Sequence, residues 1–125
     1  MNRLNHKIFL IAIFEYLNYY YDAGYEGLGG FLGSLNPAYE DGSSMDPALY
    51  KDWLDVINKK ENLEIEEAYN YMIKFLEIQI NMGWPEISDF IYKENLNGDL
   101  KKNSAVQLAR WNEAVARASK YAITY

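Results

Sequence analysis

The sequence predicts an all-α fold, a single domain of five to six helices over residues 1–125, and three observations support this prediction. Apolar residues recur with helical spacing along most of the chain. Glycine, proline and asparagine separate these stretches where helices would end. Strict alternation of polar and apolar residues is missing, so we expect no strands. Half of the residues are apolar and 16% are aromatic, which is enough for one core.

The first helix is expected over Asn5–Asp22. Its apolar residues, including the run IFLIAIF, cover most of its circumference, so it should lie at the centre of the bundle. Gly24 can adopt the left-handed conformation that follows a helix end. Leu28–Leu35 has helical spacing in spite of three interior glycines, which suits a short helix pressed closely against the first. Asn36 and Pro37 should stop this second helix.

An acidic surface loop that contains glycine and serine is expected over Ala38–Met45. Asp46 is a good N-cap and Pro47 suits the first helical position, so a third helix is predicted over Pro47–Lys59. The residues expected on its buried face are Leu49, Trp53, Val56 and Ile57. Asp52 and Asp55 are expected on its solvated side.

Three more helices follow in the second half of the chain. Ile65–Met82 is the clearest amphipathic stretch, and glutamates in its first turn favour a helix N-terminus. Gly83 should cap it and Pro85 should prevent its continuation. A short helix is expected over Pro85–Glu94, and a last one from about Asn103 to Ala122.

The charge of the chain is concentrated in one segment. Residues 15–67 hold twelve acids and three lysines, a net charge of −9, whereas the whole chain carries −6. An acidic field attracts basic partners and repels nucleic acid, so we expect no nucleic-acid partner.

Catalytic motifs are not recognisable. The chain has no cysteine, and its single histidine, His6, is expected to be an ordinary surface residue. Asp41–Asp52 lacks the glycine and glutamate positions of a calcium loop. Paired carboxylates keep an enzyme with a divalent metal formally open; they are Glu40 and Asp41, Asp52 and Asp55, and Glu64 and Glu67. We otherwise expect no enzyme, no cofactor and no metal.

The apolar run near the start of the chain bears on location. Its seven residues fall far short of the roughly 20 that span a bilayer. It ends at Glu15 and is followed by Tyr16 rather than by a small-residue cleavage site, which argues against a signal peptide. We therefore expect a buried first helix in a cytoplasmic protein without a membrane partner.

Two motifs resemble a known family. They are LGGFLGSL at Leu28–Leu35 and DGSSMDPALYKDW at Asp41–Trp53. Both are similar to segments of immunity proteins from bacterial polymorphic toxin systems of the contact-dependent growth inhibition type. The resemblance covers roughly Leu28–Trp53. It implies a protein that binds a toxin domain tightly and blocks it without doing chemistry.

The resulting hypothesis is that an acidic face occludes a cognate, basic toxin domain such as a nuclease. The residues expected to bind the partner are Asp22, Tyr25, Glu26, Tyr39, Glu40, Asp41, Asp52 and Asp55. The alternatives are a structural or homo-oligomeric module that pairs through the first helix, and the carboxylate enzyme with a divalent metal.

Overall fold

The computed structural model describes residues 3–36, 46–96, 98 and 103–124, and in these residues the all-α prediction is confirmed. The helices are α1 (His6–Asp22), α2 (Gly29–Leu35), α3 (Pro47–Val56), α4 (Ile65–Asn81), α5 (Ile87–Lys93) and α6 (Ala105–Thr124). A 3-10 helix, η1 (Glu26–Leu28), and two strands, β1 (Arg3–Asn5) and β2 (Asn62–Glu64), complete the described elements. The predicted loop Ala38–Met45 lies outside the described residues.

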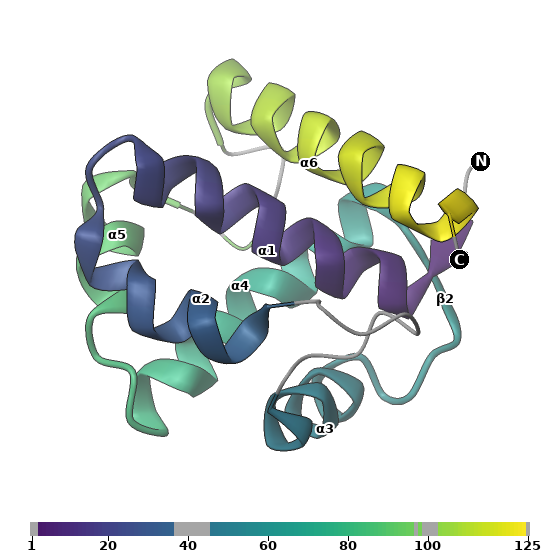
Figure 1. Ribbon diagram of the computed structural model, residues 1–125, viewed down its shortest axis with the longest axis horizontal. Coiled ribbons are helices and arrows are strands. Elements are labelled where there is room, and N and C mark those ends of the chain that lie inside the picture. Colours follow the sequence, from purple (N-terminus) through teal and green to yellow (C-terminus); the bar gives the residue numbers. More distant parts are fainter. Residues whose placement is uncertain (1–2, 37–45, 97, 99–102, 125) are drawn as a thin grey trace.

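Helix α1 is the centre of the bundle, as its sequence predicts. It lies alongside α6, while α2 to α5 lie on its other side (Figure 1). The α1 residues buried in this arrangement are Phe9, Leu10, Ile11, Ala12, Ile13, Tyr16, Leu17 and Tyr20. A helix that is apolar around most of its circumference therefore has neighbours around most of its circumference.

Local capping interactions set most of the helix ends. The Asn5 side chain accepts a hydrogen bond from a backbone N–H of the first turn of α1, and Asp46 does the same for α3, each at 2.9 Å. Pro47 occupies the first position of α3. Gly24 and Gly83 follow α1 and α4 with φ of 124° and 120°, a conformation that side chains disfavour. The predicted start at Asp46 and Pro47 and the predicted stops at Gly24 and Gly83 are confirmed, whereas Asn5 precedes α1 as its cap instead of being its first residue.

The expectation of no strands is wrong in one place. Strands β1 and β2 form an antiparallel pair in which Arg3 lies opposite Glu64 and Leu4 opposite Leu63. Each strand has three residues, too few to show an alternating pattern. This ribbon ties the beginning of the chain to the segment before α4.

Helix α3 is shorter than predicted. It ends at Val56 because Asn58 and Lys59 adopt left-handed conformations, with φ of 56° and 57°. Of the predicted buried face, Leu49, Trp53 and Ile57 are buried, whereas Val56 is only half-buried.

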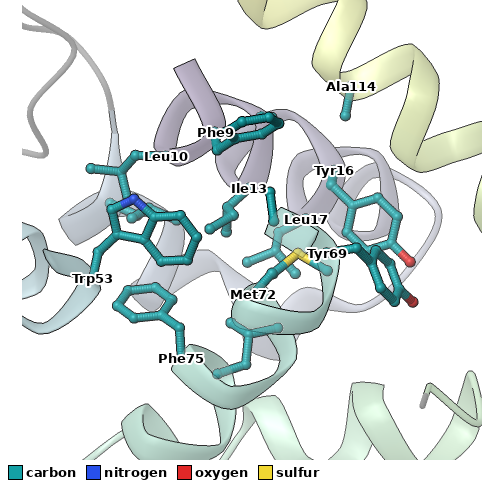
Figure 2. Close-up of a cluster of buried hydrophobic side chains, with 14 of the residues drawn as sticks. Phe9, Leu10, Ile13, Tyr16, Leu17, Trp53, Tyr69, Met72, Phe75 and Ala114 are labelled. Atoms are coloured by element: carbon teal, nitrogen blue, oxygen red, sulfur yellow. The ribbon is translucent and has the colours of Figure 1, made fainter. Parts of the chain in front are cut away.

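The core has two ends with different side chains. The apolar end consists of Phe31, Trp53, Phe75 and the half-buried Trp84. The tyrosine end consists of Tyr16, Tyr20 and Tyr69. Figure 2 shows Trp53 and Phe75 on one side and Tyr16 and Tyr69 on the other, with Met72 between them. The two ends meet across the aliphatic side chains of α1 and α4.

Candidate partner-binding surface

Three of the predicted partner-binding residues lie together at the C-terminal end of α1. Asp22 is the last residue of α1 and is exposed, while Glu26 is exposed at the start of η1. Tyr25 lies between them and is half-buried. This end of α1 faces the same side of the molecule as α5 (Figure 1).

The predicted residues on α3 lie elsewhere. Helices α3 and α5 are well separated in Figure 1. Asp55 is exposed, as expected, but Asp52 is half-buried and accepts a hydrogen bond of 2.8 Å from the Nε2 of Gln79. Asp52 is therefore the hydrogen-bond acceptor for a buried side-chain amide of α4. The prediction that Asp52 lies on the solvated side of its helix is thus wrong. Tyr39, Glu40 and Asp41 lie outside the described residues.

A cleft of about 450 Å³ opens between the turn after α1 and helix α5. Glu26 contributes to it from the turn. Glu86, which precedes α5, and Asp89 and Lys93 within it also line the cleft, because a spacing of three and four residues places them on one helical face. The cleft thus has three carboxylates and one ammonium group.

Glycine allows the two walls of the cleft to approach each other. A Cβ atom on Gly27 would lie 3.3 Å from the Cβ of Glu86, which is a very close contact. Gly24 supplies the positive φ that reverses the chain after α1. These two positions bring the turn against α5.

Sequence reasoning missed Glu86 and Asp89. They belong to residues 68–125, where acidic and basic residues are nearly equal in number, so the charge of this segment does not indicate an acidic surface. Their helical spacing places them on the same face of α5, but only the fold shows that this face lies opposite Glu26.

A buried polar network lies behind the cleft. The Tyr25 hydroxyl donates to Oε2 of Glu94, and the Nε2 of Gln107 donates to Oε1 of the same carboxylate at 2.9 Å. The hydroxyls of Tyr16 and Tyr20 both donate to Oε1 of Gln107. Gln107 is only 4% exposed, and its amide connects α1, α6 and the residue that follows α5.

Raised pKa values keep the hydroxyls of Tyr16, Tyr25 and Tyr69 protonated. The hydrogen bond that the Tyr25 hydroxyl donates to Glu94 raises the pKa of Tyr25 to about 12. Burial raises the pKa of Tyr69 to about 12. Burial also raises the pKa of Tyr16 far above its ordinary value. A lowered pKa would be needed for a tyrosine base or nucleophile at neutral pH. These hydroxyls are hydrogen-bond donors that hold the fold.

His6 is more than a surface histidine, and this corrects the sequence-based expectation. It is half-buried, its Nε2 lies 2.8 Å from the hydroxyl of Tyr50, and its Nδ1 lies 3.1 Å from the carbonyl oxygen of Glu61. His6 thereby joins the start of α1 to α3 and to the segment before β2.

Metal binding and membrane crossing would each require a recognisable feature among the described residues. No group of three or more histidine, aspartate or glutamate side chains there is arranged to hold a metal ion. None of the described helices combines the length and the apolar character required to cross a membrane.

The chain was also compared with known proteins. Comparisons with protein-family models, with curated proteins and with solved structures found no match. The function is therefore inferred from the residues, the cleft and the motifs of this chain.

Proposed function

We propose that this chain is an immunity protein, which binds a basic toxin domain through its acidic surface and blocks it without catalysis. The observation that carries the proposal is the group of carboxylates at the C-terminal end of α1. Asp22 and Glu26 lie at this end, and Glu26 shares the cleft with Glu86 and Asp89. An exposed patch in which carboxylates outnumber cations speeds the encounter with a partner of opposite charge.

The motifs at Leu28–Leu35 and Asp41–Trp53 supply the class of the partner. Their resemblance to immunity proteins implies a toxin domain, and the excess of acid favours a basic one. The carboxylates that line the cleft are ordinary partners for the lysines and arginines of such a domain. Binding over the site that the toxin uses would then be sufficient for neutralisation.

The burial of α1 favours a different protein over a second copy as the partner. Eight of its residues are buried within the chain, including Phe9 and Tyr16. Helix α1 therefore offers little apolar surface for the homodimer that the sequence left open. Obligate homodimers usually bury large apolar areas.

Co-expression with the adjacent gene tests the proposal. The chain is produced together with the protein that the adjacent open reading frame encodes, and growth and co-purification are measured. We expect restored growth, a complex of the two proteins, and an association rate that falls by more than tenfold between low and high salt. Continued killing, with no co-purified toxin domain, would reject the proposed function.

Charge reversal identifies the surface that is used. The double variant Glu26→Lys and Glu86→Lys should slow association by about tenfold or more at low salt. The single variant Glu86→Lys is compared with Asp55→Lys, which makes the same change of charge at an exposed acid on the distant α3. Equal slowing by Asp55→Lys would move the interface to α3.

A further inference from the structure

We infer that the cleft between the turn after α1 and helix α5 receives one arginine side chain of the partner, with Tyr25 as a preformed aromatic wall. The identity of the partner rests on the proposed function, but the chemistry of the cleft can be measured without it. Three features of the cleft support this inference: its charge, the weakness of its internal ion pair and the fixed position of Tyr25.

Charge complementarity selects a cation. Glu26, Glu86 and Asp89 line a space of about 450 Å³, and Lys93 is the cation among the lining residues of this cleft. Carboxylates recognise the planar guanidinium of arginine by pairs of parallel hydrogen bonds. An ammonium group offers only a compact charge on a flexible stem.

The cation already present in the cleft is easily displaced. Lys93 Nζ lies 3.2 Å from Oδ2 of Asp89, and the two side chains are 61% and 60% exposed. An exposed ion pair of this kind contributes little to stability, because water and salt screen it. Asp89 can therefore exchange Lys93 for an incoming guanidinium at small cost.

The aromatic wall is held in place from behind. The rings of Tyr25 and Phe90 meet edge to face, with centroids 5.4 Å apart. The Tyr25 hydroxyl is bound by Glu94, whose other oxygen is bound by the buried Gln107. A wall that is ordered before binding adds little entropic cost to binding.

The same chain contains an internal example of this recognition. The guanidinium carbon of Arg110 lies 4.3 Å from the ring centroid of Tyr19, and its NH1 donates to the hydroxyl of Tyr20 at 2.9 Å. A guanidinium can stack on a tyrosine while it donates hydrogen bonds in its plane. The cleft offers a tyrosine ring and carboxylate acceptors for a guanidinium from outside.

The test is a titration of the full chain with N-acetyl-arginine methylamide, followed by NMR. N-acetyl-lysine methylamide is the comparison probe. We expect saturable shifts at the residues of the turn and of α5, with a dissociation constant on the order of millimolar. The lysine probe should bind at least about threefold more weakly.

Single substitutions assign the binding to the cleft. Glu86→Gln and Asp89→Asn should each lower the affinity for the arginine probe by up to about fivefold. Lys93→Gln should raise this affinity by about twofold. Asp55→Asn removes the same charge from α3 and should leave the affinity unchanged. These side chains are exposed, so the variants should fold normally.

Tyr25→Phe tests the aromatic wall separately from the charge. It keeps the ring but removes the hydrogen bond to Glu94. The ratio of the affinities for the arginine and lysine probes should therefore fall towards one, while Glu86→Gln should still lower the affinity for the arginine probe. An unchanged preference would show that the hydroxyl does not position the ring.

The outcomes separate this inference from the proposed function. Arginine shifts that are spread equally over α3 and α5, or that Glu86→Gln leaves unchanged, would overturn the inference and leave the co-expression result standing. Saturable arginine binding in a chain that protects against no toxin would keep the inference and reject the function.

Discussion

The two ends of the core stabilise their aromatic side chains by different interactions. At the apolar end, Trp53 and Phe75 pack with ring centroids 5.7 Å apart, and the Trp53 indole N–H donates to the carbonyl oxygen of His6 at 3.2 Å. At the tyrosine end, two hydroxyls converge on the amide of Gln107. The first end depends on shape, and the second depends on complete hydrogen bonding as well.

The two buried glutamines also differ in their hydrogen-bond partners. Gln79 is 1% exposed and donates to Asp52, which is half-exposed and can also meet water. Gln107 has protein partners on both atoms of its amide. Loss of a buried side chain should therefore cost packing at one end, and packing together with several hydrogen bonds at the other.

The largest effect is expected from Trp53→Ala at the apolar end. The side chain is fully buried, and its removal should lower the free energy of unfolding by about 3–5 kcal/mol. Urea denaturation measures this loss. Trp84→Ala, at a half-buried position of the same end, should cost clearly less, and equal losses would show that burial does not set the cost there.

Gln107→Leu should have the next largest effect. The leucine fills similar space but removes the acceptor of the Tyr16 and Tyr20 hydroxyls and the donor to one oxygen of Glu94, which should cost about 2–4 kcal/mol. Gln79→Leu is the matched control and should cost about 1 kcal/mol. Similar denaturation midpoints for the two variants would contradict the claim that buried hydrogen bonds contribute more to stability at the tyrosine end than at the apolar end.

Alkaline pH should destabilise the fold through Tyr69 at the tyrosine end. The pKa of Tyr69 is raised to about 12, so the unfolded chain loses this proton first as the pH rises above 10. The stability that Tyr69 contributes is complete below pH 10 and is lost between pH 10 and 12, by about 2 kcal/mol. Denaturation midpoints across this range measure the loss, and Tyr69→Phe should reduce it. A pH-independent midpoint from 10 to 12 would contradict the assignment.

The smallest effect, with the opposite sign, is expected in α2. A Cβ atom on Gly33 would meet nothing within 4 Å, so Gly33→Ala should raise the free energy of unfolding by about 0.5–1 kcal/mol. A Cβ on Gly30 would lie 3.1 Å from the ring of Trp84. Gly30→Ala should gain less or lose stability, and thermal denaturation compares the two variants.

Much of the fold follows from local sequence signals. The start of α3 and the ends of α1 and α4 agree with their predicted caps because each cap acts over a few neighbouring residues. Gln107 also had a signal that was overlooked, since it lies four residues before the buried Trp111 on the same side of α6. A polar residue within an apolar row indicates a buried hydrogen bond.

The candidate site was only partly accessible to sequence reasoning. Tyr25 and Glu26 were predicted from the acidic segment, but Glu86 and Asp89 come from a segment without excess acid. Their meeting depends on the packing of α5 against the turn after α1. The hydrogen bond of Asp52 to Gln79 likewise joins two helices and has no local signal.

The tyrosine end also has a consequence for how the chain folds. The hydroxyls of Tyr16 and Tyr20 reach an amide that lies 91 and 87 positions later in the sequence. During synthesis, α1 leaves the ribosome long before α6 exists to cover it. Contacts between such distant segments slow folding, and uncovered apolar helices favour aggregation. Chains interrupted before α6 should accordingly be the form that most needs chaperones.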